Sequence, residues 1–322
     1  MEDLGPLLKG VSRSFYLSLK ILPPELRQQI SVAYLLARAS DTVADTKVVA
    51  REKRLGLLRS MRKGDFQPVA GLSASQALPA ESELLLRLAE VAKLKASFCA
   101  EDRVLTDCLL DTIVSGQIFD LERFAGEDAA SLTALSDEAE LDHYTYMVAG
   151  CVGEFWTKLA GLRLPALKGW DTDQLLSLGV AFGKGLQLVN VLRDVPRDLR
   201  NGRCYLPVLT PKDLLDPMNY PAVQPLYNRL LDTALGHLEA GWCYTLSIPP
   251  SLWKLRLACA WPIWIGLETM GLLRKGNPLD PKQVIMVPQW RTNLLLAESF
   301  LLCRSDRLME RSFQRRLKRA RS

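Results

Sequence analysis

Two pairs of aspartates have the spacing that places carboxylates on one face of a helix. Asp41 and Asp45 are four residues apart, and so are Asp194 and Asp198 further along the chain. Residues four apart are neighbours on a helix surface. Four carboxylates on two facing helices would repel one another unless a cation lay between them, and Mg²⁺ commonly completes its shell with substrate phosphates. The spacing therefore predicts a metal-bridged diphosphate between helices.

Further polar residues precede each pair on the same helix face, at offsets of three or four. They are Arg38 and Tyr34 before Asp41, and Asn190 and Gln187 before Asp194. The helix of the first pair is apolar nearly all round, which indicates burial, and buried carboxylates need partners. Without these surroundings, either pair could equally be an ordinary solvated acidic pair.

The second pair contains a proline, which makes its geometry less regular. Pro196 removes a backbone donor and clashes with the carbonyl four residues earlier, so we expect a kink or a helix end. Arg193 supplies a cation beside Asp194. Arg203 follows a predicted helix stop at 200–202, where it could fold over a diphosphate or remain a solvated loop arginine.

Two other segments carry polar groups beside apolar ones. Tyr146 precedes Gly150 and Gly153, two small residues that allow another helix or an apolar ligand to approach closely; a hydrogen-bonded core tyrosine is the alternative. The run Ser12-Arg13-Ser14-Phe15 suits phosphate oxygens and suits a helix N-cap equally well.

The same residues carry a resemblance. The motifs S-R-S-F, Y-x-x-x-R-x-x-D-T-x-x-D, Y-x-V-A-G-x-V-G, Q-x-x-N-x-x-R-D-x-x-x-D and G-R-x-Y-L-P follow in this order from 11 to about 207. Together they resemble the squalene/phytoene synthase family of head-to-head prenyl synthases. The resemblance implies an all-α class I isoprenoid-synthase bundle around a central cavity. It also implies Mg²⁺, two farnesyl diphosphates as substrates and, for squalene synthesis, NADPH.

The resemblance assigns roles position by position. The metal ligands would be Asp41, Asp45, Asp194 and Asp198. Diphosphate would meet Ser12, Arg13, Ser14, Tyr34, Arg38, Arg193 and Arg203, and the prenyl chain would meet Phe15, Val148, Gly150, Gln187 and Asn190. Tyr146 would handle the proton. An apolar cavity protects a carbocation from water, which agrees with these roles.

The chain departs from the family at positions that often hold additional acids. Ser40, Ala44 and Arg197 stand there, so each site keeps two aspartates. The A-R-A-S-D-T-x-x-D form resembles squalene synthases, and we expect squalene synthesis. Presqualene, dehydrosqualene, hydroxysqualene or phytoene synthesis is the alternative, and a non-catalytic helical assembly factor is a remote one. The absence of a C-terminal membrane anchor resembles the bacterial type.

Composition and periodicity favour a single all-α domain over 1–322. The chain is 48% hydrophobic, so it can bury a sizeable core. Apolar residues recur at helical spacing, and no sustained strand-like alternation occurs. The ranges expected to be helical are 25–46, 81–100, 101–124, 137–162, 171–195, 222–246 and 251–274; a surface loop is expected at 64–80.

The net charge of +5 comes from the C-terminal end. Residues 304–322 contain eight basic and two acidic residues. The excess positive charge is therefore concentrated in a C-terminal tail and does not indicate a nucleic-acid-binding groove. With Leu302, Met309, Phe313 and Leu317 at helical spacing, 303–322 could be a basic amphipathic helix that touches anionic lipid, or a solvated helix end. Seven scattered cysteines and no signal peptide or membrane span lead us to expect a cytoplasmic protein with reduced thiols.

Overall fold

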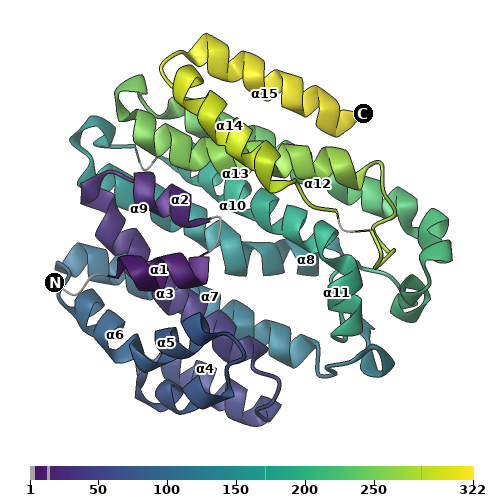
Figure 1. Ribbon diagram of the computed structural model, residues 1–322. Helices are drawn as coiled ribbons and strands as arrows, with labels where there is room; N and C mark the ends of the chain where they lie inside the picture. Colours follow the sequence, from purple (N-terminus) through teal and green to yellow (C-terminus); the bar gives the residue numbers. More distant parts are fainter. Residues whose placement is uncertain (1–3, 13–14, 171, 284) are drawn as a thin grey trace. The chain divides into compact units, whose positions relative to one another are not determined.

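The computed structural model describes residues 4–12, 15–170, 172–283 and 285–322. It is built almost entirely of helices, as the sequence predicted (Figure 1). Its residues form two compact units, Met1–Arg123 with Phe155–Trp170 (the first unit) and Phe124–Glu154 with Asp171–Ser322 (the second unit). The expectation of one domain over 1–322 stays a prediction.

The first unit is organised around one long buried helix. Its elements are α1 (Gly5–Ser12), α2 (Phe15–Ile21), α3 (Pro24–Asp45), α4 (Arg51–Arg62), η1 (Gln67–Ser75), α5 (Pro79–Leu86), α6 (Leu88–Ala96), α7 (Ala100–Arg123), the larger part of α9 (Cys151–Arg163) and η4 (Pro165–Leu167). Helix α3 starts at a proline, whose missing N–H costs nothing in the first turn. Leu26, Leu35 and Leu36 are fully buried, which confirms the predicted burial of this helix.

Two expectations for the first unit were wrong in detail. The helix expected over 81–100 is divided at Arg87 into α5 and α6. The segment 64–80, expected to be a surface loop, contains the 3₁₀-helix η1, in which Val69 and Leu72 are buried. The two apolar side chains anchor this segment to the core, a contribution that its high Gly, Ser and Pro content concealed.

The second unit contains the longest helix, α12, and the only strands in the described part of the chain. Its elements are η2 (Ala129–Ser131), β1 (Thr133–Ala134), α8 (Glu138–Thr145), the π-helical turn η3 (Tyr146–Gly150), the start of α9, α10 (Asp173–Arg193), α11 (Val195–Arg200), β2 (Arg203–Cys204), η5 (Pro211–Leu215), η6 (Pro217–Asn219), α12 (Tyr220–Ser247), η7 (Pro250–Leu252), α13 (Trp253–Leu273), α14 (Gln289–Leu302) and α15 (Asp306–Arg321). The strands β1 and β2 pair in parallel.

Helix α10 packs closely because its neighbours lack side chains where the backbones meet. A Cβ on Gly153 would lie 1.8 Å from the Gly179 carbonyl oxygen, and one on Gly183 would lie 2.1 Å from that of Ala149. This confirms that the small residues near Tyr146 permit a close helix approach. Among the described helices α10 alone is long and apolar enough to cross a membrane, a property that core helices share.

The basic C-terminal segment is helical, but its apolar face is buried within the protein. Met309, Phe313 and Leu317 of α15 are at most 4% exposed, and the Phe313 ring stacks on Trp242 at 4.6 Å. The apolar face, which could have touched lipid or ended in solvent, therefore belongs to the core of the second unit. Most charged residues of this helix are exposed, whereas Arg316 is buried.

Candidate active site

The first aspartate pair lies at the C-terminal end of α3. Asp41 accepts a hydrogen bond from Gln117 Nε2 of α7, and its Oδ2 lies 3.5 Å from Arg38 Nη1. Arg38 also donates to Glu81 of α5 at 2.5 Å. Gln117 and Glu81 were not found from the sequence, because only tertiary packing brings α5 and α7 to this end of α3. Asp45 is exposed at the end of the helix.

Asp41 holds its negative charge at an energetic cost. Desolvation by the surrounding protein and, to a smaller extent, the neighbouring Asp45 raise the pKa of its carboxyl to about 6, against the opposing effect of Arg38. The Asp41 side chain nevertheless remains 44% exposed. A carboxylate that is accessible and only partly neutralised suits a cation.

The residues near the N-terminus take different roles. Ser12 is the last residue of α1, and its buried hydroxyl donates to the Leu8 carbonyl. The Ser12 hydroxyl is therefore engaged within α1, and the N-cap considered for the following helix stays a prediction. Phe15 begins α2 and packs its ring 5.3 Å from that of Tyr34, whose hydroxyl donates to Val11 O at 3.2 Å. Arg13 and Ser14 lie outside the described residues.

The second aspartate pair lies where α10 ends and α11 begins. Asp194 sits between the two helices, which confirms the helix end expected from Pro196. Arg193 binds Asp194 through two contacts of 2.8 Å. Arg197 lies 3.0 Å from Asp194 and 3.3 Å from Asp198, so one guanidinium joins both carboxylates.

Asp198 is the more strongly desolvated member of the second pair. Desolvation raises the pKa of its carboxyl to about 7, although Arg197 opposes the shift. Asp198 and Arg203 both line a cavity of about 10 Å³. This volume is about that of one water.

Arg203 is held by backbone pairing. Helix α11 ends at Arg200, and Gly202 adopts a φ of +82°, a conformation that glycine reaches without strain. Arg203 then lies in β2, where Gly202 and Cys204 carbonyls accept hydrogen bonds from Thr133 and Leu135. The loop expected here is therefore a short strand. Two residues are too few for an alternating pattern to reveal.

Tyr146 opens the π-helical turn η3. The Cys151 N–H bonds to the Tyr146 carbonyl, one residue further along than in an α-helix. Tyr146 Oη donates to Glu154 Oε2 at 3.2 Å, and burial together with Glu154 raises the pKa of the phenol. Turns of this kind are frequent at functional sites. Glu154 escaped the sequence analysis because a regular helix would place it differently.

The remaining predicted residues divide between exposed and packed positions. Gln187 is half-buried, and Asn190 is exposed on α10. Val148 is half-buried in η3. Gly150 is buried against α10, since a Cβ there would lie 3.1 Å from Lys184 Cγ and 3.3 Å from Val180 Cγ1. Their contacts with a prenyl chain stay predictions.

The donor sets fit Mg²⁺ that is shared with phosphate. Within the described ranges, no three His, Cys, Asp or Glu side chains are grouped to hold a metal by themselves. Each aspartate pair offers two carboxylates, and Mg²⁺ is usually bound by one or two carboxylates plus substrate phosphates and water. The raised carboxyl pKa values of Asp41 and Asp198 favour a cation at each pair.

Comparison with known proteins decides the family. The squalene/phytoene synthase model matches residues 8–291. The chain belongs to the squalene/phytoene synthase family. It is 28% identical over 309 residues to the squalene synthase of Eremothecium gossypii, covering 91% of this chain and 66% of that protein. It is 29% identical over 292 residues to the 15-cis-phytoene synthase of a Paracoccus species, covering 85% of this chain and 82% of that protein.

A solved structure supports the fold. The complex of TcSQS with the ligand E5700 matches with a TM-score of 0.79 at 20% identity, covering 98% of this chain and 89% of that one. The chain spans about two thirds of the length of the Eremothecium squalene synthase.

The departures from the family motifs have structural consequences. Ser40 and Ala44 are buried in α3, and the Ser40 hydroxyl donates to Ala37 O at 2.7 Å. Arg197 is different, because its side chain is 66% exposed and contacts both aspartates of its pair. In this family member a cation stands where many relatives have an acid.

Proposed function

We propose that the protein is a squalene synthase. It joins two farnesyl diphosphates head to head through presqualene diphosphate, and then reduces this intermediate to squalene with NADPH. The observation that carries the proposal is the presence of all four motif aspartates, each pair beside arginine (Arg38 for the first; Arg193 and Arg197 for the second). The similarity to squalene synthases supports it.

The aspartates would hold the metal, and the arginines would hold phosphate. Asp41 with Asp45, and Asp194 with Asp198, would bind Mg²⁺, which when bound neutralises the charge on a departing diphosphate. Arg38 and Arg203 can donate to other phosphate oxygens, because guanidinium groups match phosphate geometry. Both arginines are already aligned by protein contacts, Arg38 by Glu81 and Arg203 by its strand.

Tyr146 is proposed to receive the proton lost when the cyclopropane closes. Its Hη is directed to Glu154 Oε2, so the lone pairs of Oη are available to a carbocation. As Oη takes the proton from carbon, Hη passes to Glu154, and the phenol stays neutral throughout. The raised pKa of the phenol agrees with a group that works without ionising.

The alternative is a family member that stops elsewhere, namely a presqualene, dehydrosqualene, hydroxysqualene or phytoene synthase. Similarity to a phytoene synthase keeps this alternative open. The NADPH requirement rests on family resemblance. A non-catalytic helical assembly factor is a remote third candidate, and the retained aspartates weigh against it.

Product analysis tests the proposal. The protein is incubated with farnesyl diphosphate and Mg²⁺, with and without NADPH, and the products are identified by gas chromatography and mass spectrometry. We expect presqualene diphosphate without NADPH and squalene with it. Conversion of geranylgeranyl diphosphate to a C40 product, with farnesyl diphosphate inert, would overturn the assignment.

A further inference from the structure

Helix α14 exposes a row of apolar side chains to solvent, where a surface helix normally has polar ones. Trp290, Leu294 and Leu301 are 67%, 51% and 80% exposed. With Ala297 they recur at four- and three-residue intervals, so they fall within about 60° around the helix axis. We call these four residues the apolar stripe. Surface helices normally bury such a stripe.

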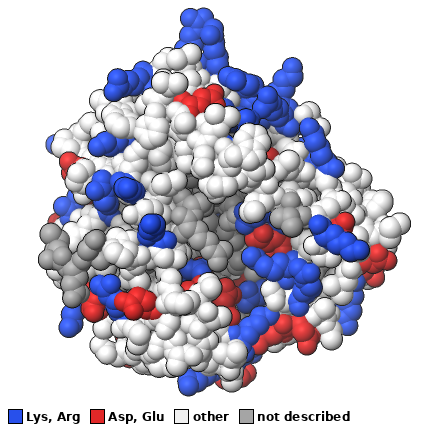
Figure 2. Space-filling view, in the orientation of Figure 1, with Lys and Arg blue, Asp and Glu red and all other residues white. Residues whose placement is uncertain are grey.

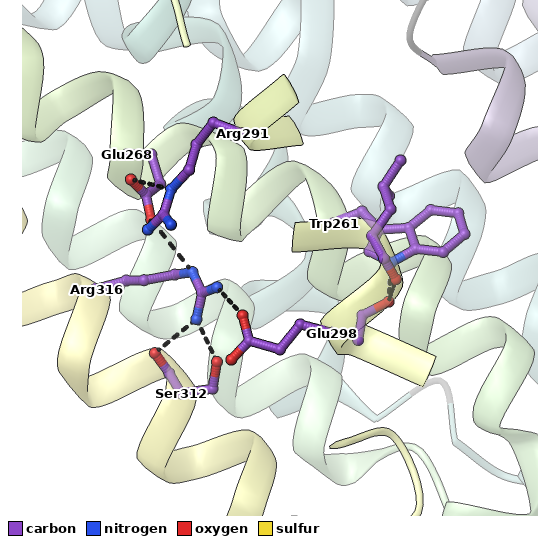
Figure 3. A network of polar contacts seen from close by, with 8 residues as sticks. Trp261, Glu268, Arg291, Glu298, Ser312 and Arg316 are labelled. Carbon is purple, nitrogen blue, oxygen red and sulfur yellow. Dashed lines mark hydrogen bonds and ion pairs between the residues drawn. The ribbon is translucent and has the colours of Figure 1, made fainter. Parts of the chain in front are cut away.

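The protein-facing side of α14 carries the buried Leu295 together with polar contacts that fix the helix to the protein. Arg291 Nη2 lies 2.8 Å from Glu268 Oε1 of α13, and Ser299 Oγ accepts a hydrogen bond of 2.8 Å from Trp261 (Figure 3). Glu298 lies 2.9 Å from Arg316 of α15. These contacts determine the rotation of α14, so the outward direction of the apolar stripe follows from a defined network.

Arg316 connects the three helices from a nearly buried position. Its side chain is 5% exposed and lies 3.5 Å from Glu268 (Figure 3). Its guanidinium lies 5.1 Å from the centre of the Trp264 ring. It therefore holds α15 beside α14. Since Met309, Phe313 and Leu317 of α15 are buried in the core, α15 contributes mainly its charged side chains to an outer surface.

Those charges form a second stripe next to the first. Arg307, Arg311, Arg315 and Lys318 are exposed at helical spacing on α15, and we call them the basic stripe. None of the four has an ion pair among the described residues. The two acids of α15 are engaged elsewhere: Asp306 lies 2.5 Å from Arg256, and Glu310 accepts a hydrogen bond from Trp242.

The charge distribution is visible on the surface. Lys and Arg side chains gather along the edge formed by α15, whereas the surface over α14 is mostly uncharged (Figure 2). An apolar strip with an exposed tryptophan beside unpaired cations matches the two layers of an anionic bilayer surface, where apolar side chains enter the acyl boundary and cations meet headgroups.

We propose that the apolar stripe of α14 and the basic stripe of α15 dock the protein on an anionic phospholipid bilayer. A bilayer fits better than a second copy of the chain. In a twofold dimer through this surface the same patch meets itself, so the two basic stripes would oppose each other. The proposal is independent of the catalytic assignment, because it concerns binding alone.

Vesicle binding by the full chain tests the proposal. We expect flotation with phosphatidylcholine–phosphatidylglycerol vesicles, weaker binding as salt is raised, and little binding to phosphatidylcholine alone. The double variant Leu294→Glu/Leu301→Glu should partition onto the vesicles at least about tenfold more weakly. Each change removes an apolar side chain that would enter the bilayer and adds a negative charge. The matched control Leu86→Glu/Val104→Glu changes exposed apolar residues of the first unit and should bind like the parent protein.

The cations and the tryptophan have tests of their own. Replacing Arg307, Arg311 and Arg315 by Gln should lower partitioning roughly a hundredfold. Replacing Lys53, Lys63 and Lys168 by Gln removes the same amount of charge and should lower partitioning much less. Brominated lipid should quench part of the tryptophan emission, and Trp290→Phe should remove that quenching.

Several results would overturn the proposal. They are equal binding to neutral and anionic vesicles, full binding by the Leu294→Glu/Leu301→Glu variant, or no quenching of Trp290. A dimer in solution that this double variant converts to a monomer would assign the surface to a second copy instead. Circular dichroism of each variant verifies that the helices are retained.

Discussion

Replacing Arg197 by Gln should increase the affinity of the second aspartate pair for Mg²⁺. The guanidinium lies 3.0 Å from Asp194 and 3.3 Å from Asp198, so it occupies the space beside both carboxylates. A Mg²⁺ ion lies about 2.1 Å from a carboxylate oxygen. An ion on Asp194 would therefore come within roughly 5 Å of this fixed positive charge.

The size of the effect follows from Coulomb's law. A divalent cation and a guanidinium about 5 Å apart repel by about 1.7 kcal/mol in water. The dielectric constant of water is appropriate because the Arg197 side chain is 66% exposed. Salt screening reduces the repulsion to roughly 1 kcal/mol. Arg197→Gln should then lower the half-saturating Mg²⁺ concentration about fivefold, and Arg197→Glu should lower it further.

Two measurements check this result. The rise in melting temperature with Mg²⁺ reports binding without substrate, and the rate of diphosphate release reports it during turnover. Arg200→Gln is the matched control, since Arg200 is an exposed arginine of the same helix α11. An unchanged Mg²⁺ midpoint in Arg197→Gln, or an equal shift in Arg200→Gln, would refute the reasoning.

The other predictions concern the metal, the proton, the pH and the core. Asp41→Ala or Asp194→Ala, like chelation of Mg²⁺, should abolish turnover while circular dichroism stays unchanged; retained activity would contradict the metal assignment. Tyr146→Phe and Glu154→Gln should each lower the rate of presqualene diphosphate formation by roughly 10²-fold or more, measured in single-turnover assays, and a parental rate in either would exclude the proton route. Burial and Lys184 lower the pKa of His237, against the opposing effect of Asp142; the folded state therefore binds fewer protons than the unfolded state below about pH 6.5. The free energy of unfolding, measured in urea, should fall as the pH drops through this range, and it should fall less in His237→Gln. An equal pH dependence in the two proteins would exclude His237 as the cause. Arg316→Met should lower the free energy of unfolding by about 3 kcal/mol because it leaves Glu298 without its partner, and a loss below about 1 kcal/mol would show that the network is replaceable.

Local patterns predicted the helices and the positions of the aspartate pairs. Pro24 starts α3, and Pro196 separates α10 from α11, because proline acts on the backbone of its own neighbourhood. The partners of Asp41 and Arg38 were not predictable in this way. Gln117 and Glu81 reach them from helices distant in sequence, so only packing identifies them.

The sequence also could not predict whether an apolar stripe of a helix faces the core or the solvent. Trp290, Leu294 and Leu301 have the spacing of a helix that buries its apolar side, yet they face outward. On α15 the same kind of stripe, Met309 and Phe313, is buried. Periodicity locates an apolar face, whereas the contacts on the other side of the helix, which in α14 are the buried Leu295 and the ion pairs of Arg291 and Glu298, determine which way that face points.

The π-helical turn at Tyr146–Gly150 is equivalent to one residue added within a continuous helix. Deleting a single residue there would leave an ordinary α-helix with almost the same composition. Because the wider turn takes up the added residue, Glu154 reaches the face of Tyr146 eight residues further on, where an unbroken α-helix would rotate it away by about 80°. The acid–base pair thus depends on this turn as much as on the identity of its two residues, and a relative with a regular helix here would need its acid about seven residues after the tyrosine to keep the pair.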